Sequence, residues 1–88
     1  MADWIGQNPD EVNDLAALFD TKAGELESLV QAISAKLAGT TWQGPDRTRF
    51  ETQDWTNIQT NLNQAAQVLR DTGTVARNNA TEQVNASA

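Results

Sequence analysis

The chain has 88 residues, a formal net charge of −6, and neither cysteine nor histidine. A chain of this length forms only a small core, which disulfides cannot reinforce here, so we expect association with a second chain to supply the missing stability. The acidic balance excludes the basic surface typical of nucleic-acid binding and disfavours attraction to anionic lipid. Without histidine or cysteine, we expect no metal centre and no cofactor.

The residue patterns of catalytic sites are missing as well. The sequence has no cysteine nucleophile, no serine in a glycine-flanked elbow and no phosphate-binding loop. Asp10 with Asp14, and Glu51 with Asp54, share a helix face by spacing, but a cation site or an acid/base pair needs more ligands and a pocket. We therefore expect a protein that is not an enzyme and acts through protein contacts.

The N-terminal segment has no targeting signature. Residues 1–6 lack the basic start and apolar centre of a secretory signal peptide, and no apolar run approaches the ~20 residues that span a membrane. Trp4 and Ile5 either fold back on the end of a bundle or belong to a loosely ordered terminus. Ordinary rules leave such a chain in the cytosol, unless an export route that needs no cleavable signal carries it out.

A strong helix start follows at Asn8-Pro9-Asp10-Glu11, where Asn8 can cap and Pro9 suits the first helical position. The pattern predicts a helix over residues 9–38. Gly24 inside it marks either a close helix crossing or a tolerated surface glycine. Large apolar residues at heptad and half-heptad spacing form one stripe, which we assign to a core or dimer seam: Val12, Leu15, Phe19, Leu26, Leu29, Ile33 and Leu37.

Residues 39–45 are the organising feature of the chain, because helix-breaking residues gather there between two long helical patterns. Gly39 and Gly44 allow unusual backbone angles, and Pro45 suits the start of a new helix, so the chain reverses direction. Trp42 lies within this turn. Its ring either packs over the end of the hairpin, or is offered to a partner, or does both.

The second helix is predicted over residues 45–77. Its apolar stripe, with heptad spacing from Trp55 onward, contains Trp55, Ile58, Leu62 and Leu69. We assign this stripe as well to a core or dimer seam, and we expect Trp55 in the core. Phe50 falls outside this register, so we expect it to fill space near the turn. Glycine among β-branched residues at 71–75 predicts a bend or fraying, and residues 78–88 read as a flexible tail.

The expected fold is all-α: a single antiparallel helix-turn-helix hairpin over residues 1–88. Two helices of ~45 Å, at 1.5 Å per residue, cover only one side of each apolar stripe. Pairing with a second hairpin would close a four-helix bundle, so we expect a dimer.

The chain resembles the WXG100, or ESAT-6-like, family in the order of its features. These are a first helix, Trp42-Gln43-Gly44 in the bend, and a second helix with Phe50 and Trp55 on its first turns. The resemblance covers essentially the whole chain. It implies a helical hairpin that pairs with itself or a related WXG100 protein and is exported by type VII (ESX-type) secretion machinery without a cleaved signal. It also implies that Trp42 and Gly44 form the turn half of the export motif, and that the protein is secreted or displayed at the cell surface.

The sequence departs from that family in the second half of the motif, a tyrosine followed four residues later by an acid. It contains no tyrosine, and Asn78 stands four residues before the best-placed acid, Glu82. Either a partner carries the intact motif, or other tail residues are recognised. Two other roles remain open for such a hairpin: a targeting chaperone for a co-secreted protein, and a membrane-active protein that inserts its apolar stripes into lipid.

Overall fold

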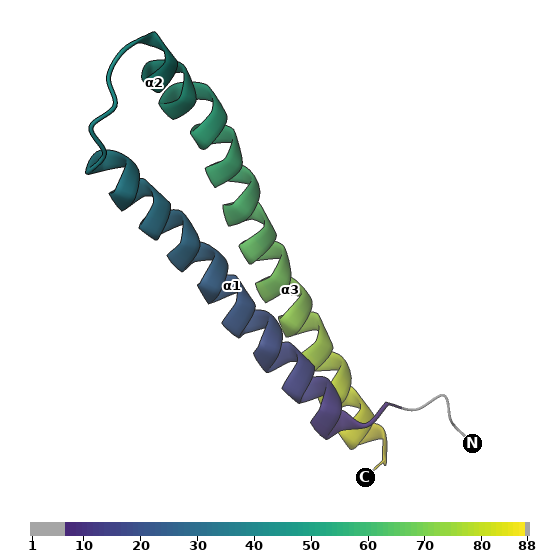
Figure 1. The fold of residues 1–88 in the computed structure, drawn as a ribbon. Helices are drawn as coiled ribbons and strands as arrows, with labels where there is room; N and C mark the ends of the chain where they lie inside the picture. The colour runs from purple at the N-terminus through teal and green to yellow at the C-terminus, as the bar shows by residue number, and fades with distance from the viewer. Residues whose placement is uncertain (1–6, 88) are drawn as a thin grey trace.

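The computed structural model describes residues 7–87, and Trp4 and Ile5 lie outside this range. It contains the helices α1 (Pro9–Ala38), α2 (Pro45–Arg49) and α3 (Trp55–Ser87), and a π-helical turn, η1 (Phe50–Asp54), joins α2 to α3. Figure 1 shows α1 and α3 running antiparallel and diverging toward the turn, with α2 and η1 at the wide end. The prediction of an all-helical hairpin is therefore confirmed for the described residues.

The start of α1 has the expected cap. The backbone N–H of Glu11 donates to Asn8 Oδ1 at 3.1 Å, and Pro9 occupies the first turn, where its missing N–H costs nothing. Asp10 and Glu11 place negative charge at the positive end of the helix dipole, and Lys36 lies in the last turn. Local sequence signals thus define both ends of this helix.

The second half of the chain is more helical than its composition suggested. Residues 78–87 are helical where a flexible tail was predicted, because α3 continues to Ser87, and the helix runs through Gly73 without the fraying that was one of the two outcomes expected there. The reason lies in packing. Gly73 and Ala80 are both buried, so this part of α3 has a neighbour to lie against, which propensity alone cannot reveal.

Small side chains form the contact between the two long helices. The buried positions of α1 are seven residues apart, and so are those of α3 after Trp55. We call this set the seam, and it consists of Ala16, Ala23, Val30, Ala66, Gly73 and Ala80. A Cβ added to Gly73 would lie 3.3 Å from the carbonyl oxygen of Ala16, so the backbones approach closely there. By contrast, a Cβ on Gly24 would meet nothing within 4 Å, so the close crossing is at Gly73.

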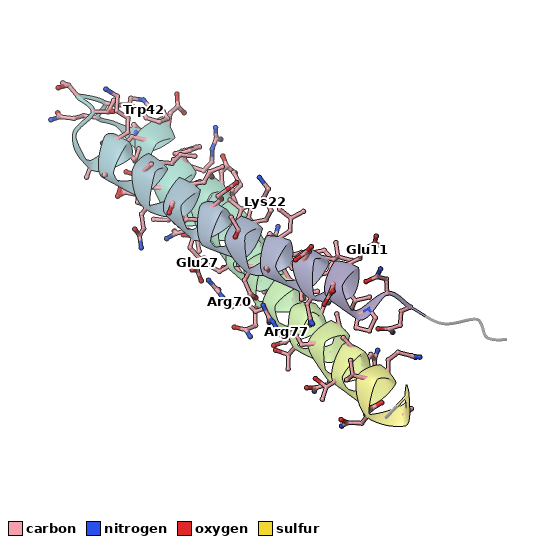
Figure 2. All side chains as sticks on the ribbon, turned by 90° about the horizontal axis from the view of Figure 1, so that it is seen from below. Glu11, Lys22, Glu27, Trp42, Arg70 and Arg77 are labelled. Atoms are coloured by element: carbon pink, nitrogen blue, oxygen red, sulfur yellow. The ribbon has the colours of Figure 1, made fainter. Side chains whose placement is uncertain are left out.

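The seam separates two chemically different sides of the hairpin. Residues four positions after a seam residue project about 40° to one side of it, and those four positions before project to the other. Asp20 and Glu27 of α1 follow the seam in this way, as do Arg70 and Arg77 of α3. The polar side is therefore the side on which the two helices are joined by the ion pairs Asp20–Arg77 and Glu27–Arg70. Figure 2 shows Glu27, Arg70 and Arg77 along one edge of the hairpin, and Lys22 on the opposite edge.

A set of larger apolar residues lies on the opposite side of the seam, which we call the apolar face. It comprises the half-buried Val12, Phe19, Leu26, Leu62 and Leu69 and the exposed Leu15, Leu29, Ile33 and Ile58. Ile33 is 40% exposed and Leu15 47% exposed, so the chain by itself leaves this face incompletely covered. Among the residues that the sequence assigned to a core or dimer seam, only Trp55 is buried within the chain, and Leu37 is half-buried near the turn.

None of the helices within residues 7–87 combines the length and the apolar character needed to cross a membrane.

Candidate functional site

The turn between the helices is fixed by its backbone and by one cation. Gly39 caps α1, its N–H donating to the carbonyl of Ala35 at 3.1 Å. Gly44 has a φ of 116°, which a residue with a side chain rarely adopts, and Pro45 follows at the start of α2. Gly44 is thus a backbone requirement of the turn, and no contact with a partner is needed to explain it.

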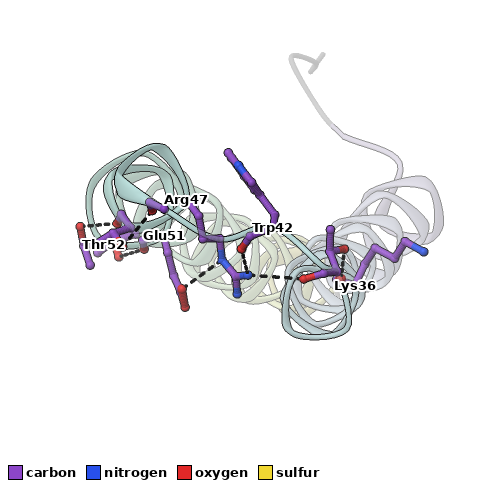
Figure 3. Close-up of polar contacts among 9 residues, drawn as sticks. Lys36, Trp42, Arg47, Glu51 and Thr52 are labelled. Atoms are coloured by element: carbon purple, nitrogen blue, oxygen red, sulfur yellow. Dashed lines mark hydrogen bonds and ion pairs between the residues drawn. The ribbon is translucent and has the colours of Figure 1, made fainter.

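Arg47 joins the turn to the helix that follows. Its Nη1 donates to the carbonyl oxygen of Trp42 at 2.9 Å and to that of Thr40 at 3.5 Å, while its Nε donates to Glu51 Oε2 at 3.3 Å. These bonds are drawn in Figure 3. Because the side chain of Arg47 is only 19% exposed, its charge is held among these acceptors, and the loop carbonyls are satisfied without regular secondary structure.

The indole of Trp42 packs on Phe50 and keeps one part open to solvent. The two ring centroids are 5.6 Å apart with planes inclined at 42°, a favourable tilted arrangement for an aromatic pair. Trp42 is nevertheless 38% exposed. Of the alternatives raised by the sequence, the packing role is therefore present, and the exposed part of the ring remains accessible to a partner. Phe50 lies near the turn, as its place outside the heptad register indicated.

Trp55 closes the hairpin one turn further along. It is 5% exposed, and its Nε1 donates to Ser34 Oγ of α1 at 3.1 Å. The ring is thus core, as expected, and its polar atom finds a partner across the helices. Trp55 is the first residue of α3, its indole is far larger than the alanines of the seam, and α1 and α3 diverge toward this end of α3 (Figure 1).

An open cleft of about 460 Å³ lies in this wider end, lined by Ser34, Leu37, Ala38, Arg47, Glu51, Trp55 and Gln59. Ser34 follows Glu27 by seven residues, which places the cleft on the polar side. Figure 3 shows the Trp42 ring and the Glu51 side chain pointing to opposite sides of the hairpin end. Since Glu51 lines the cleft, the Trp42 ring projects on the side of the apolar face.

Two hydrogen-bond donors that line the cleft are already paired within the chain. The indole N–H of Trp55 is bonded to Ser34, and the guanidinium of Arg47 to Glu51 and the turn carbonyls. Within residues 7–87, no three His, Cys, Asp or Glu side chains are grouped so that they could hold a metal ion.

Glu27 and Arg70, which form an ion pair on the polar side, both have shifted pKa values. Hydrogen bonding from Arg70 lowers the pKa of the Glu27 carboxyl below its ordinary value, and desolvation opposes this only in part. The same hydrogen bond raises the pKa of Arg70. Both groups are therefore charged near neutral pH, which is the state of a structural ion pair and not of an acid/base catalyst.

Arg47 and the seam were missed by sequence reasoning. A signal for Arg47 was present, because a cation in the first turns of a helix opposes the helix dipole and needs another source of stabilisation. The seam also had a signal, since small residues recur at every seventh position in both halves of the chain. Asn78 and Glu82, which the sequence left unassigned, lie exposed one turn apart on α3.

Comparisons with protein-family models, with curated proteins and with solved structures found no match. The fold and the site together define an all-helical hairpin with a partly exposed tryptophan on its turn and a half-covered apolar face.

Proposed function

We propose that this protein is a small non-catalytic substrate of a type VII (ESX-type) secretion system, a WXG100-like hairpin that is exported as a dimer. The observation that carries the proposal is Trp42-Gln43-Gly44 at the reversal between two long helices, with the tryptophan 38% exposed. In this proposal Trp42 is contacted by the export machinery, and Gly44 supplies the backbone angle that the turn needs.

The apolar face supports the dimeric part of the proposal. Leu15, Leu29, Ile33 and Ile58 are each at least 40% exposed and lie on one side of the hairpin. Covering them with a second hairpin would remove this apolar surface from water, at about 25 cal/mol per Å² buried. The partner is a second copy of this chain or a related hairpin, and the latter would supply the tyrosine that this sequence lacks.

A targeting-chaperone role uses the same face and differs only in what covers it. If the natural occupant is the hairpin of a larger co-secreted protein, the two should form a one-to-one complex that excludes self-association. Co-expression of this chain with the product of the adjacent gene, followed by mass measurement of the complex, distinguishes the two roles. Insertion of the apolar face into lipid is a separate alternative, and absence of dye release from neutral and acidic liposomes would exclude it.

Export is tested by replacing Trp42. In cells that carry a type VII system, Trp42→Ala should remove the protein from the culture medium while intracellular amounts, helicity and dimer mass stay the same. The matched control is Gln43→Ala, which changes the neighbouring exposed residue and leaves the motif intact. Undiminished secretion of the Trp42→Ala variant would refute a recognition role for this ring.

A further inference from the structure

The π-helical turn η1 connects two aromatic contacts that a regular helix could not make together. Trp55 N–H donates to the carbonyl of Phe50, five residues earlier, where an α-helix would use the fourth. In an α-helix, side chains five residues apart point about 140° away from each other. In the π-helical turn they follow each other by about one turn and point to similar sides.

The extra residue in η1 therefore rotates the side chains of the preceding helical residues, Phe50 among them, about the helix axis relative to the seam. Downstream of the turn, Trp55 is buried and bonded to Ser34. Upstream, Phe50 meets Trp42 with ring centroids 5.6 Å apart. With Trp55 held in the hairpin, an uninterrupted α-helix would turn Phe50 away from the side on which Trp42 lies.

Threonine hydroxyls support the irregular backbone at this place. Thr48 Oγ1 donates to the carbonyl of Gly44, Thr52 Oγ1 to that of Thr48, and Thr56 Oγ1 to that of Glu51. The last of these bonds spans five residues and so matches the wider spacing of the turn. Such bonds bend helices and satisfy carbonyls that the regular ladder leaves short of donors.

We propose that η1 is a positioning element for Trp42: its additional residue turns Phe50 beneath the indole and thereby holds the ring on the apolar side of the hairpin end. Phe50 is in this view a positioning residue, because it acts through Trp42. The inference rests on the proposed function only in that Trp42 is the residue that the export machinery contacts.

The test shortens the turn by one residue. Deletion of Gln53, an exposed residue of η1, should convert Pro45–Ser87 to a continuous α-helix while the seam from Trp55 onward is kept. The matched control is Gln53→Ala, which keeps the chain length. The probe is ¹⁹F NMR of protein labelled with 5-fluorotryptophan, with the Trp42 line assigned by its loss in Trp42→Phe.

In the deletion variant the Trp42 line should shift toward its position in the urea-unfolded chain, while the Trp55 line and the far-ultraviolet circular dichroism stay the same. Phe50→Ala should shift the Trp42 line in the same direction, and Phe50→Tyr, which retains a ring, should leave it in place. A Trp42 line that stays fixed on deletion of Gln53 overturns the proposal, whether or not it responds to Phe50→Ala. If the deletion variant does not fold, an unmoved Trp42 line in Phe50→Ala overturns it, and a shift that Phe50→Tyr reverses supports it.

Secretion of the same variants separates this inference from the proposed function. A shifted Trp42 line together with lost secretion supports both. A shifted line with full secretion supports the positioning role of η1 and overturns the role of Trp42 in export.

Discussion

Arg70 and Glu27 meet through two parallel hydrogen bonds across α1 and α3, Nη1 to Oε2 and Nη2 to Oε1, both 2.7 Å long. Arg77 and Asp20 form a second ion pair between the helices, seven residues later on α3 and seven residues earlier on α1. The seven-residue spacing matches that of the seam, so correct packing of the small residues and correct pairing of the charges occur in the same alignment of the helices. A shift of one helix by a turn would separate both the packed seam residues and the paired charges. The ion pairs therefore specify the register of the helices, even though their exposure to solvent limits their contribution to stability.

The Glu27–Arg70 pair should make stability depend on pH. The folded protein lowers the pKa of Glu27, so the stabilisation is fully present above the unfolded-state pKa and is lost as the pH falls through the folded-state pKa. We expect Glu27→Gln to lower the Tm at about pH 7, and to lower it much less at a pH low enough to protonate Glu27 in the folded protein, because both side chains are then neutral.

The control for this prediction is Glu25→Gln. Glu25 pairs with Lys22 of the same helix at 3.1 Å and makes no bridge between helices. Its replacement should change the Tm less than that of Glu27 at neutral pH. An equal loss for Glu27→Gln at both pH values would contradict the assignment.

Two glycines inside the long helices, Gly24 of α1 and Gly73 of α3, should respond in different ways to replacement by alanine. At Gly24 a Cβ meets nothing within 4 Å, so Gly24→Ala should gain the helix propensity of about 0.5–1 kcal/mol and raise the Tm by about 2–8 °C. At Gly73 the same Cβ presses on the backbone of α1, so Gly73→Ala should gain less or lose stability, and Gly73→Leu should force the helices apart. Thermal unfolding at one fixed protein concentration measures the difference. Equal gains at the two sites would show that the helices do not approach closely at Gly73.

A charge placed on the apolar face should prevent dimer formation, whereas the same charge placed on the polar side should not. Ile33→Glu places a carboxylate on the apolar face, and Gln31→Glu places the same charge on the exposed polar side two residues away. If a second hairpin covers the apolar face, Ile33→Glu should reduce the sedimentation mass to that of one chain at micromolar concentration, because an unpaired buried charge is costly. Gln31→Glu should keep the mass of the wild type. A wild-type protein that already sediments as one chain would refute the dimer.

The N-cap of α1 should contribute measurably to the stability of the hairpin. Asn8→Ala removes the acceptor of the Glu11 N–H and should cost about 1 kcal/mol, while Asn8→Ser should retain most of the stability. The urea midpoint should fall with an unchanged m-value, because the surface exposed on unfolding stays the same. A midpoint that does not move would show that water replaces the cap at no cost.

Much of the local structure followed from residue chemistry. Asn8 and Pro9 marked the start of α1, and Gly39, Gly44 and Pro45 marked the reversal, because caps and turns depend on the backbone preferences of single residues. Phe50 was placed near the turn because it broke the heptad pattern, and η1 is the physical cause of that break. At the site, Trp42 and Trp55 could be named from the sequence. The acceptors of Arg47 could not, since they are backbone carbonyls whose positions depend on the fold of the turn.

The sequence by itself determined two amphipathic helices, the place of the turn and its tryptophan, because these depend on interactions among neighbouring residues. Only the tertiary structure decided which residues lie between the helices. Periodicity marks an apolar side of a helix, but the distance between backbones depends on facing pairs, and here Gly73 and the alanines allow an approach that moves the large side chains outward. The same contact supports α3 as far as Ala80, within the stretch where local propensity alone predicted a tail.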